Sequence, residues 1–202
     1  MHHTAAERYR LIFSWLLGLI VVFLIIFSES PYIKSPLYEA LELFGFALLI
    51  LATLGRIWAT VYIGGRKDEE LCQDGPYSIS RNPLYLFSLL GAIGIILAAQ
   101  KPIILAIIVP FFVFYYFVIK GEEERLLSFF GQEYADYAKR VGRIIPTFKT
   151  YTSQESFTVY PKVLFRSMIH ASIFMWIFML LEVLEYCKEH TSLIPTLFTL
   201  PF

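Results

Sequence analysis

Long apolar runs alternate with polar stretches along this chain. Runs of about 20 apolar residues form helices long enough to cross the hydrocarbon core of a bilayer. Five runs approach or exceed that length, at residues 11–27, 37–63, 84–99, 103–119 and 163–187. The pattern predicts an all-α, polytopic membrane protein with about five transmembrane helices.

The third and fourth runs are separated by only Gln100, Lys101 and Pro102. Connections this short join helices that lie antiparallel. We therefore expect the third and fourth helices to form a tight hairpin.

The composition agrees with a membrane location. Of the 202 residues, 57% are hydrophobic and 17% are charged, whereas a soluble domain averages about 45–50% apolar and about 25% charged residues. The formal net charge is zero and no block of like charges occurs, which argues against nucleic acid as a partner. We expect a single integral membrane domain over residues 1–202, with the bilayer as its main partner. The two cysteines, Cys72 and Cys187, have no metal-ligand spacing, and we expect them on opposite sides of the membrane.

Basic residues are unevenly distributed between the two sides of the predicted helices. Most lie at the N-terminus or in the second and fourth connections, namely Arg8, Arg10, Arg66, Lys67, Arg81, Lys120, Arg125, Lys139, Arg140, Arg143, Lys149, Lys162 and Arg166. Three further ones lie in the remaining segments, Lys34, Lys101 and Lys188. Because positively charged loops stay in the cytoplasm, we expect the N-terminus and both polar connections there. Residues 64–83 and 120–162 would then share one face and build one site.

Residues 122–137 have the periodicity of an amphipathic helix. At about 100° per residue, one apolar stripe contains Leu126, Leu127, Phe130, Tyr134, Tyr137 and Val141. Glu123 falls within this stripe, Glu122 lies at its edge and Glu124 points away. A carboxylate on a buried face is costly unless a cation or hydrogen-bond donors meet it. Either an arginine at the membrane surface or a bound ligand could do so.

Four short motifs follow one another between residues 62 and 148. They are Gly75-Pro76-Tyr77, Arg81-Asn82-Pro83-x-Tyr85, Glu122-Glu123-x-x-Leu126-x-x-x-Phe130-Gly131-x-x-Tyr134-x-x-Tyr137 and Arg143-x-x-Pro146. In this order and spacing they resemble the isoprenylcysteine carboxyl methyltransferase family and its phospholipid methyltransferase relatives. Two positions depart from the family pattern, since Asn82 stands where the family often has His and Phe87 where it often has a small Gly. Residues 163–187 add a C-terminal transmembrane helix to the resembling core.

The resemblance implies a methyltransferase that uses S-adenosylmethionine at the cytoplasmic face. Its lipidic acceptor would enter from the bilayer, and carboxyl O-methylation of an isoprenylcysteine-like acceptor is the activity implied first. The implied cofactor-binding residues are Tyr77, Arg81, Asn82, Pro83, Tyr85, Glu122, Glu123, Tyr134, Tyr137 and Arg143. Their chemistry suits the cofactor, because the glutamates can meet an ammonium, an arginine a carboxylate and the tyrosine rings a sulfonium. We assign catalytic roles to Arg81, which would hold an acceptor carboxylate, and to Glu123, which would be the general base for an amine acceptor.

Three other functions stay open at this level. The same motifs suit a phospholipid (ethanolamine) N-methyltransferase. A related NADPH-dependent membrane reductase would bind its cofactor in a similar helical cavity. A non-catalytic membrane adaptor would account for the two departures at Asn82 and Phe87.

Two features inside the predicted helices also invite a functional interpretation. Arg56 lies about 10 Å from the end of its run at Ile63 by helical rise. An arginine at that depth either snorkels toward the headgroups or grips a carboxylate of a substrate or cofactor. The aromatic run at residues 111–117 either packs against lipid and neighbouring helices or lines an apolar tunnel for an isoprenoid or acyl tail.

Overall fold

The computed structural model describes residues 36–66, 69–99 and 103–191, together with residues 16, 19, 20, 23, 27–29, 198 and 199 near the two ends. Most of the first predicted span, residues 11–27, lies outside these ranges, and so does the predicted hairpin turn at residues 100–102. Of the basic residues counted above, Arg8, Arg10, Lys34, Lys67 and Lys101 also lie outside the described residues.

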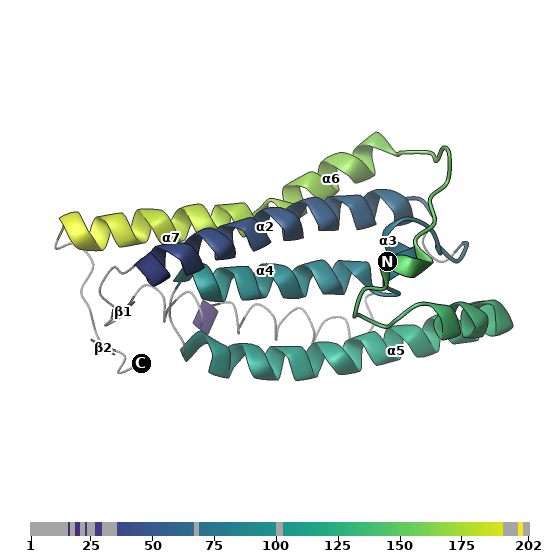
Figure 1. Cartoon of the computed structure of the whole chain (residues 1–202), viewed down its shortest axis with the longest axis horizontal. Helices are drawn as coiled ribbons and strands as arrows, with labels where there is room; N and C mark the ends of the chain where they lie inside the picture. The colour runs from purple at the N-terminus through teal and green to yellow at the C-terminus, as the bar shows by residue number, and fades with distance from the viewer. Residues whose placement is uncertain are drawn as a thin grey trace.

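Helices make up the described structure. They are α2 (Pro36–Ile63), α3 (Pro76–Ile79), α4 (Pro83–Ala99), α5 (Ile103–Arg140), α6 (Pro161–Ala171) and α7 (Ile173–His190), with a 3-10 turn η1 (Phe148–Thr150). Two strands of two residues each, β1 (Ser28–Glu29) and β2 (Phe198–Thr199), pair in parallel near the ends of the chain. The predicted all-α fold is confirmed (Figure 1).

Prolines set where several of these helices begin. α2, α3, α4 and α6 start at Pro36, Pro76, Pro83 and Pro161. Proline has no N–H and a backbone angle φ suited to a helix, so it fits the first turn, where an N–H would have no intrahelical partner. The second and third predicted spans consequently agree with α2 and α4 to within one residue at each end.

The helices lie in layers, with α6 and α7 against α2, α2 against α4, and α5 along the far side of α4 (Figure 1). α4 and α5 run in opposite directions, as a hairpin would require. Small residues allow α2 and α4 to approach closely, since a Cβ placed on Gly45 would lie 2.8 Å from the backbone N of Ala98. Close approach at glycine is a common way of packing helices in a bilayer.

The last predicted span is two helices rather than one. α6 ends at Ala171 and α7 begins at Ile173. Ser172 lies between them: its N–H still donates to the carbonyl of Met168 at 2.9 Å, and its hydroxyl donates to the carbonyl of Ile169 at 2.9 Å. Serine side chains compete with the backbone in this way. The break leaves the apolar run intact, and Pro161–Lys188 is still long and apolar enough to cross a membrane, as is Pro36–Ile63.

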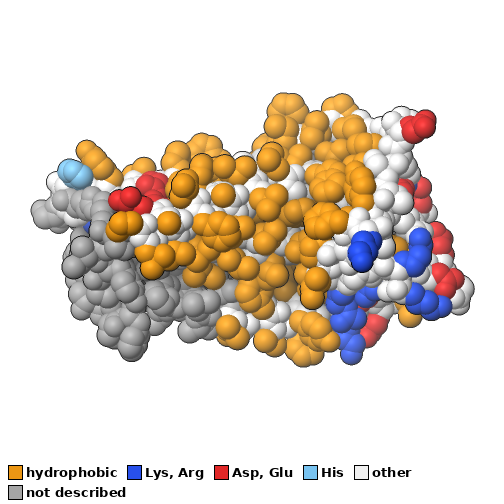
Figure 2. Space-filling view, in the orientation of Figure 1, with side chains coloured by type: hydrophobic (Ala, Val, Ile, Leu, Met, Phe, Trp, Pro, Cys, Tyr) orange, Lys and Arg blue, Asp and Glu red, His pale blue; other side chains and the backbone are white. Residues whose placement is uncertain are grey.

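Apolar side chains cover the flank of the helical bundle. Most of the Lys, Arg, Asp and Glu side chains in view gather at the end that carries residues 69–82 and 120–160, and a smaller acidic patch lies at the opposite end (Figure 2). We call the end that carries residues 69–82 and 120–160 the polar end. Leu43, Leu54, Ile169 and Trp176 are each more than 60% exposed on the flank. A soluble protein rarely exposes so continuous an apolar surface, so this is a membrane protein. Two of the described helical stretches are long and apolar enough to cross a membrane. The number of five transmembrane helices stays a prediction.

α5 joins the fourth predicted span to the predicted amphipathic helix in one element with a kink at Gly131, where φ is 50° and ψ is −121°. Beyond the kink, Tyr134, Tyr137 and Val141 are buried, as predicted for the apolar stripe. Leu127 is 46% exposed, which differs from the prediction because it lies at the edge of the stripe and the buried face is narrower than the pattern suggested.

The kink offers a test of backbone conformation alone. Replacing Gly131 with alanine should lower the stability by about 1–3 kcal/mol, since a Cβ meets no atom within 4 Å but the positive φ disfavours any side chain. Thermal unfolding in detergent, followed by circular dichroism, measures this. Gly121→Ala is the matched control, because Gly121 lies in the same helix with open space and no positive φ, and it should be neutral or stabilising. Equal losses in the two variants would contradict the strained kink.

Candidate functional site

The two polar segments of the chain lie against each other at the polar end. The backbone N of Gly75 donates to the carbonyl of Thr152 at 2.8 Å, that of Arg81 to Gly142 at 2.9 Å and that of Thr147 to Ile79 at 2.9 Å. These bonds hold residues 75–82 against residues 142–152. These contacts confirm that the two segments meet, whereas the membrane face on which they lie stays a prediction.

A glycine permits the turn that starts the first of these segments. Gly75 has φ of 56°, and a Cβ at this position would lie 2.3 Å from the ring of Tyr62. Glycine is the residue that tolerates both conditions. The turn leads directly into α3 and brings the Tyr77 and Arg81 side chains toward α5.

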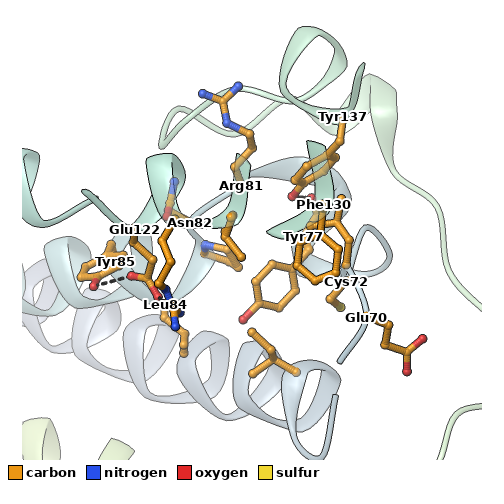
Figure 3. Close-up of a pocket in the computed structure, with 15 residues that line it drawn as sticks. Glu70, Cys72, Tyr77, Arg81, Asn82, Leu84, Tyr85, Glu122, Phe130 and Tyr137 are labelled. Carbon is orange, nitrogen blue, oxygen red and sulfur yellow. Dashed lines mark hydrogen bonds and ion pairs between the residues drawn. The ribbon is translucent and has the colours of Figure 1, made fainter. Parts of the chain in front are cut away.

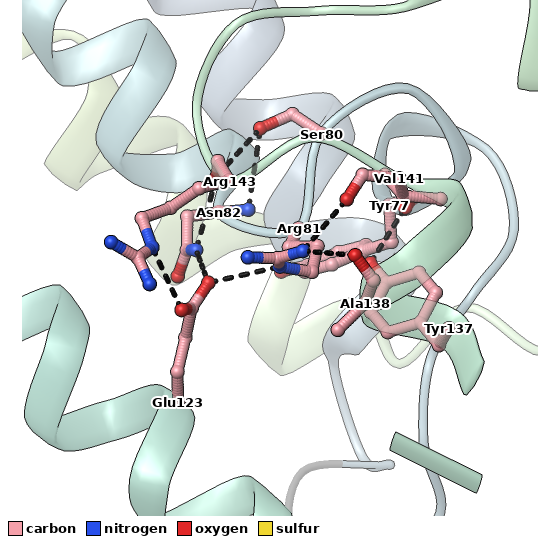
Figure 4. A network of polar contacts seen from close by, with 9 residues as sticks. All are labelled: Tyr77, Ser80, Arg81, Asn82, Glu123, Tyr137, Ala138, Val141 and Arg143. Atoms are coloured by element: carbon pink, nitrogen blue, oxygen red, sulfur yellow. Dashed lines mark hydrogen bonds and ion pairs between the residues drawn. The ribbon is translucent and has the colours of Figure 1, made fainter. Parts of the chain in front are cut away.

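Glu123 joins the two segments through its carboxylate (Figure 4). Its Oε1 accepts hydrogen bonds from Arg81 Nε at 3.0 Å and from Asn82 Nδ2 at 3.1 Å, and its Oε2 accepts one from Arg143 Nε at 2.8 Å. Only 7% of Glu123 is exposed. Three donors thus compensate a carboxylate that has been removed from water. We call Glu123, Arg81, Asn82 and Arg143 the clasp.

Arg81 also holds the end of α5. Its Nη1 donates to the carbonyl oxygens of Ala138 at 2.5 Å and Val141 at 2.9 Å. The last carbonyls of a helix have no intrahelical partner, and a cation there also interacts favourably with the helix dipole. Arg81 therefore fixes where α5 ends as well as pairing with Glu123.

Asn82, one of the two departures from the family pattern, acts as a hydrogen-bond donor in the clasp. Its Nδ2 donates to Glu123 and also to the carbonyl oxygen of Arg143 at 3.1 Å. A neutral amide has two N–H groups on one nitrogen and so can serve both acceptors. This role needs no group that titrates near neutral pH.

Seven of the ten predicted cofactor-binding residues line one cavity of about 80 Å³ (Figure 3). They are Tyr77, Arg81, Asn82, Pro83, Tyr85, Glu122 and Tyr137. The other three, Glu123, Tyr134 and Arg143, do not line it. Glu123 and Arg143 belong to the clasp instead, and burial together with the charge of Glu123 raises the pKa of Tyr134 to about 12.

The cavity has further walls that the sequence analysis did not assign to the site: Ile63, Glu70, Leu71, Cys72, Leu84, Arg125, Leu126 and Phe130. Leu126 and Phe130 could have been predicted as cavity residues from the sequence, since both fall on the predicted apolar stripe beside Glu122. Residues 70–72 could not have been predicted in this way, because they lie in a polar connection without periodicity. Only the folded structure brings them to the cavity.

Tyr77 presents a buried hydroxyl to this cavity. Its ring points into the cavity in Figure 3, only 6% of the residue is exposed, and the hydroxyl has no hydrogen-bond partner within the described part of the chain. Burial raises the pKa of Tyr77 well above its usual value, so the phenol stays protonated. A buried hydroxyl without a partner costs about 1–3 kcal/mol. A bound ligand with an acceptor atom would remove that cost.

Glu122 is the carboxylate that faces the same cavity. Tyr85 donates to its Oε2 at 2.9 Å, and Arg125 Nη2 lies 3.9 Å from its Oε1 (Figure 3). Its side chain is 31% exposed. The two adjacent glutamates therefore have different surroundings, because Glu123 points into the clasp and Glu122 into the cavity.

A second cavity adjoins the first at Tyr85, which lines both. It has a volume of about 300 Å³ and lies between α4 and α5. Its walls are almost entirely apolar or aromatic: Tyr85, Ser88, Leu89, Ile93, Phe112, Tyr115, Tyr116, Ile119 and Ile144. The predicted aromatic run thus contributes three residues to an apolar cavity, which is of the size that small-molecule ligands occupy.

The central part of the chain is similar to a known family. A family model described as phospholipid methyltransferase matches residues 41–133, from within α2 to just beyond the kink of α5. This part of the chain is similar to the phospholipid methyltransferases. The matched residues include both glutamates and the Arg81 to Tyr85 motif, whereas α6 and α7 lie beyond the match.

The chain is also similar to two metal-resistance proteins. The chain is 29% identical over 182 residues to the nickel-cobalt-cadmium resistance protein NccN of Alcaligenes xylosoxydans xylosoxydans, covering 90% of this chain and 85% of that protein. It is 35% identical over 126 residues to the cobalt-zinc-cadmium resistance protein CzcN of Cupriavidus metallidurans, covering 62% of this chain and 57% of that protein.

The resemblance to the isoprenylcysteine enzymes is also found. The chain is 40% identical over 82 residues to the protein-S-isoprenylcysteine O-methyltransferase of Saccharomyces cerevisiae, covering 39% of this chain and 34% of that protein. No solved structure matches. Together with the family model, this similarity supports a membrane methyltransferase.

Proposed function

We propose that this protein transfers a methyl group from S-adenosylmethionine to a lipidic acceptor held in the membrane, with carboxyl O-methylation of an isoprenylcysteine-like acceptor as the first candidate. One observation carries the proposal: a polar cavity with an unpaired buried hydroxyl meets a 300 Å³ apolar cavity at a single residue, Tyr85. A methyl donor and a lipid tail would need two such compartments in contact.

The residues of the polar cavity fit the proposed cofactor. Glu122 would meet its ammonium, Arg125 its carboxylate and the Tyr77 hydroxyl a further acceptor atom, while the ring of Tyr85 offers a face to a cation. When bound, S-adenosylmethionine supplies a methyl group activated by its sulfonium. The cavity encloses about 80 Å³, so part of the ligand would lie outside it.

The chain would contribute alignment and exclusion of water rather than covalent chemistry. The apolar cavity would orient the acceptor tail, and Tyr85 would be the wall at which the acceptor head meets the polar cavity. A carboxylate acceptor is already ionised and needs no base. An amine acceptor must lose a proton, and Glu123 could take it only by leaving the clasp, because both of its oxygens accept hydrogen bonds there.

We also propose the topology that the basic residues suggest. The polar end would lie in the cytoplasm, the chain would be one integral membrane domain with a core at residues 62–148, and five spans would include a hairpin of α4 and α5. The gathering of Lys and Arg at the polar end in Figure 2 and the opposite directions of α4 and α5 in Figure 1 support this arrangement.

Calorimetric titration tests the cofactor assignment. The purified protein in detergent should bind S-adenosylmethionine, and Tyr77→Phe should bind it about tenfold more weakly because a hydrogen bond to the ligand is lost. The thermal midpoint of Tyr77→Phe should stay the same or rise, since the variant loses a buried hydroxyl that has no protein partner. Binding of NADPH in place of S-adenosylmethionine, or none at about 1 mM, would contradict the proposal.

A radiolabelled methyl-transfer assay on membrane extracts would then separate the two acceptor classes. Base-labile label indicates a carboxyl ester, whereas stable label indicates an N-methyl group. The match to the phospholipid methyltransferase model makes an amine acceptor the second candidate. Binding of S-adenosylmethionine with no label transferred to any lipid would favour a non-catalytic role.

A further inference from the structure

α2 carries a single arginine in its apolar run, and this residue is not part of the polar cavity. Arg56 is seven residues from the end of the helix at Ile63, a depth of about 10 Å by helical rise. A cation at this depth in a membrane helix is costly and usually has a specific partner.

The guanidinium of Arg56 does not reach back to the polar end. Its Nη1 donates to the hydroxyl of Ser88 on α4, and the ring of Phe174 on α7 lies 5.8 Å from its Cζ. Ser88 is itself five residues into α4, about 8 Å from Pro83 by helical rise. The guanidinium is therefore held by side chains of α4 and α7, which favours a specific role for Arg56 over snorkelling.

No carboxylate of the described residues forms an ion pair with Arg56. A guanidinium has five N–H donors, and Ser88 accepts from one of its nitrogens while donating its own proton to the carbonyl of Leu84 at 2.7 Å. The charge is thus solvated by one hydroxyl and one aromatic face. A buried cation with so few partners is stabilised strongly by an anion.

The place where an anion could approach is the apolar cavity. Ser88 and Tyr115 both line it, and Ser88 is the hydroxyl that accepts a hydrogen bond from Arg56. Both polar groups lie next to the junction with the polar cavity at Tyr85, since Ser88 follows Tyr85 by one turn of α4 and the ring of Tyr115 lies 5.6 Å from that of Tyr85. The cavity therefore combines apolar walls with a positive potential from one side.

The C-terminal helices keep Arg56 in this position. Phe174 covers the guanidinium and packs so closely on α4 that a Cβ at Gly91 would lie 2.6 Å from its ring. Without α7, that side of Arg56 would face lipid. Because α7 lies beyond residues 41–133, this cover is an addition to the part of the chain that matches the family model.

We propose that Arg56, acting through Ser88 and Tyr115, holds the anionic head of a single-chain amphiphile whose tail fills the apolar cavity. The proposal rests on the proposed function, because that amphiphile would be the methyl acceptor. It deepens that function by favouring a lipidic carboxylate over an amine, since a protonated amine would be repelled and a neutral head would leave Arg56 without a counter-ion.

The test compares a charged and an uncharged ligand on the full chain in neutral detergent. The probes are N-acetyl-S-farnesylcysteine and its carboxamide, which differ only in the charge of the head. The wild-type protein should bind the acid at least about tenfold more tightly than the amide. Arg56→Gln should reduce that preference to about twofold or less, Arg56→Lys should keep most of it, and each should bind S-adenosylmethionine as the wild type does.

Arg166→Gln is the matched control, because Arg166 is an exposed cation on α6 whose described contact is His170. It should keep the full preference for the acid. Ser88→Ala, which removes the hydroxyl between Arg56 and the cavity, should also reduce the preference and serves if Arg56→Gln does not fold. The proposal would be overturned if Arg56→Gln or Ser88→Ala kept the full preference for the acid over the amide. It would also be overturned if the wild-type protein bound the two ligands equally tightly.

Two further outcomes are informative. One distinguishes a bound membrane lipid from the methyl acceptor, and the other distinguishes the anion site from the proposed function. In nanodiscs, retention of phosphatidylglycerol by the wild type but not by Arg56→Gln, with no binding of the acid, would show a bound lipid and overturn the acceptor assignment. A preference for the acid in a wild-type protein that does not bind S-adenosylmethionine would instead support the anion site and refute the proposed function.

Discussion

Glu123→Ala should unfold the polar end of the bundle. Removing this carboxylate leaves Arg81 and Arg143 as buried or half-buried cations without a counter-ion and breaks the bond to Asn82. Loss of one partner of a buried ion pair costs about 3–5 kcal/mol. The thermal midpoint in detergent should fall by more than in any other single carboxylate variant of α5, and limited proteolysis should cut within residues 142–152.

Glu124→Ala is the control for this result. The Glu124 side chain is 69% exposed and lies 4.0 Å from Lys120, an exposed pair worth about 0–1 kcal/mol. Its thermal midpoint should stay close to that of the wild type. If the two variants lost equal stability, the clasp could not be what holds the two polar segments together.

Glu122→Gln should lower the affinity for S-adenosylmethionine by about 10–100-fold, the value of a hydrogen bond to a charged group. Glutamine keeps an oxygen that can accept from Tyr85 and removes only the charge that faces the cavity. Stability should therefore change little. Calorimetric titration measures the affinity, and the thermal midpoint of the same sample checks the fold.

Glu133→Gln is the appropriate comparison here, because Glu133 is an exposed carboxylate of the same helix that accepts a hydrogen bond from Gln73 at 2.9 Å. It should bind S-adenosylmethionine like the wild type. Wild-type affinity in Glu122→Gln would refute the assignment of the ammonium to Glu122 and would leave the exposed side of the cavity as the place to search.

The neighbouring glutamates show how far the sequence could predict the site. Helical periodicity correctly placed Glu123 on the buried face and Glu124 on the exposed one, because successive residues are rotated by about 100°. It could not decide what would meet the buried carboxylate. The partners Arg81 and Arg143 come from segments outside this helix, so only their positions in space reveal the clasp.

The apolar cavity and Arg56 show a second limit of sequence patterns. The aromatic run at residues 111–117 was equally consistent with lipid contact and with a tunnel wall, because both surfaces are apolar. The structure separates its members, since Phe112, Tyr115 and Tyr116 line the cavity while Phe117 is 64% exposed. For Arg56, the depth in the helix could be counted along the chain, but the contacts with Ser88 and Phe174 join three helices.

The sequence by itself determined the membrane character, the starts of the helices at prolines and the polar end, because hydropathy, backbone restriction and helical periodicity act over short distances along the chain. The four spaced motifs also pointed to the family that the comparisons support. The tertiary structure decided which glutamate is clasped and which faces a ligand cavity, where the helix kinks and what surrounds Arg56. Those features depend on contacts between residues far apart in the chain, and local patterns do not encode the distances between them.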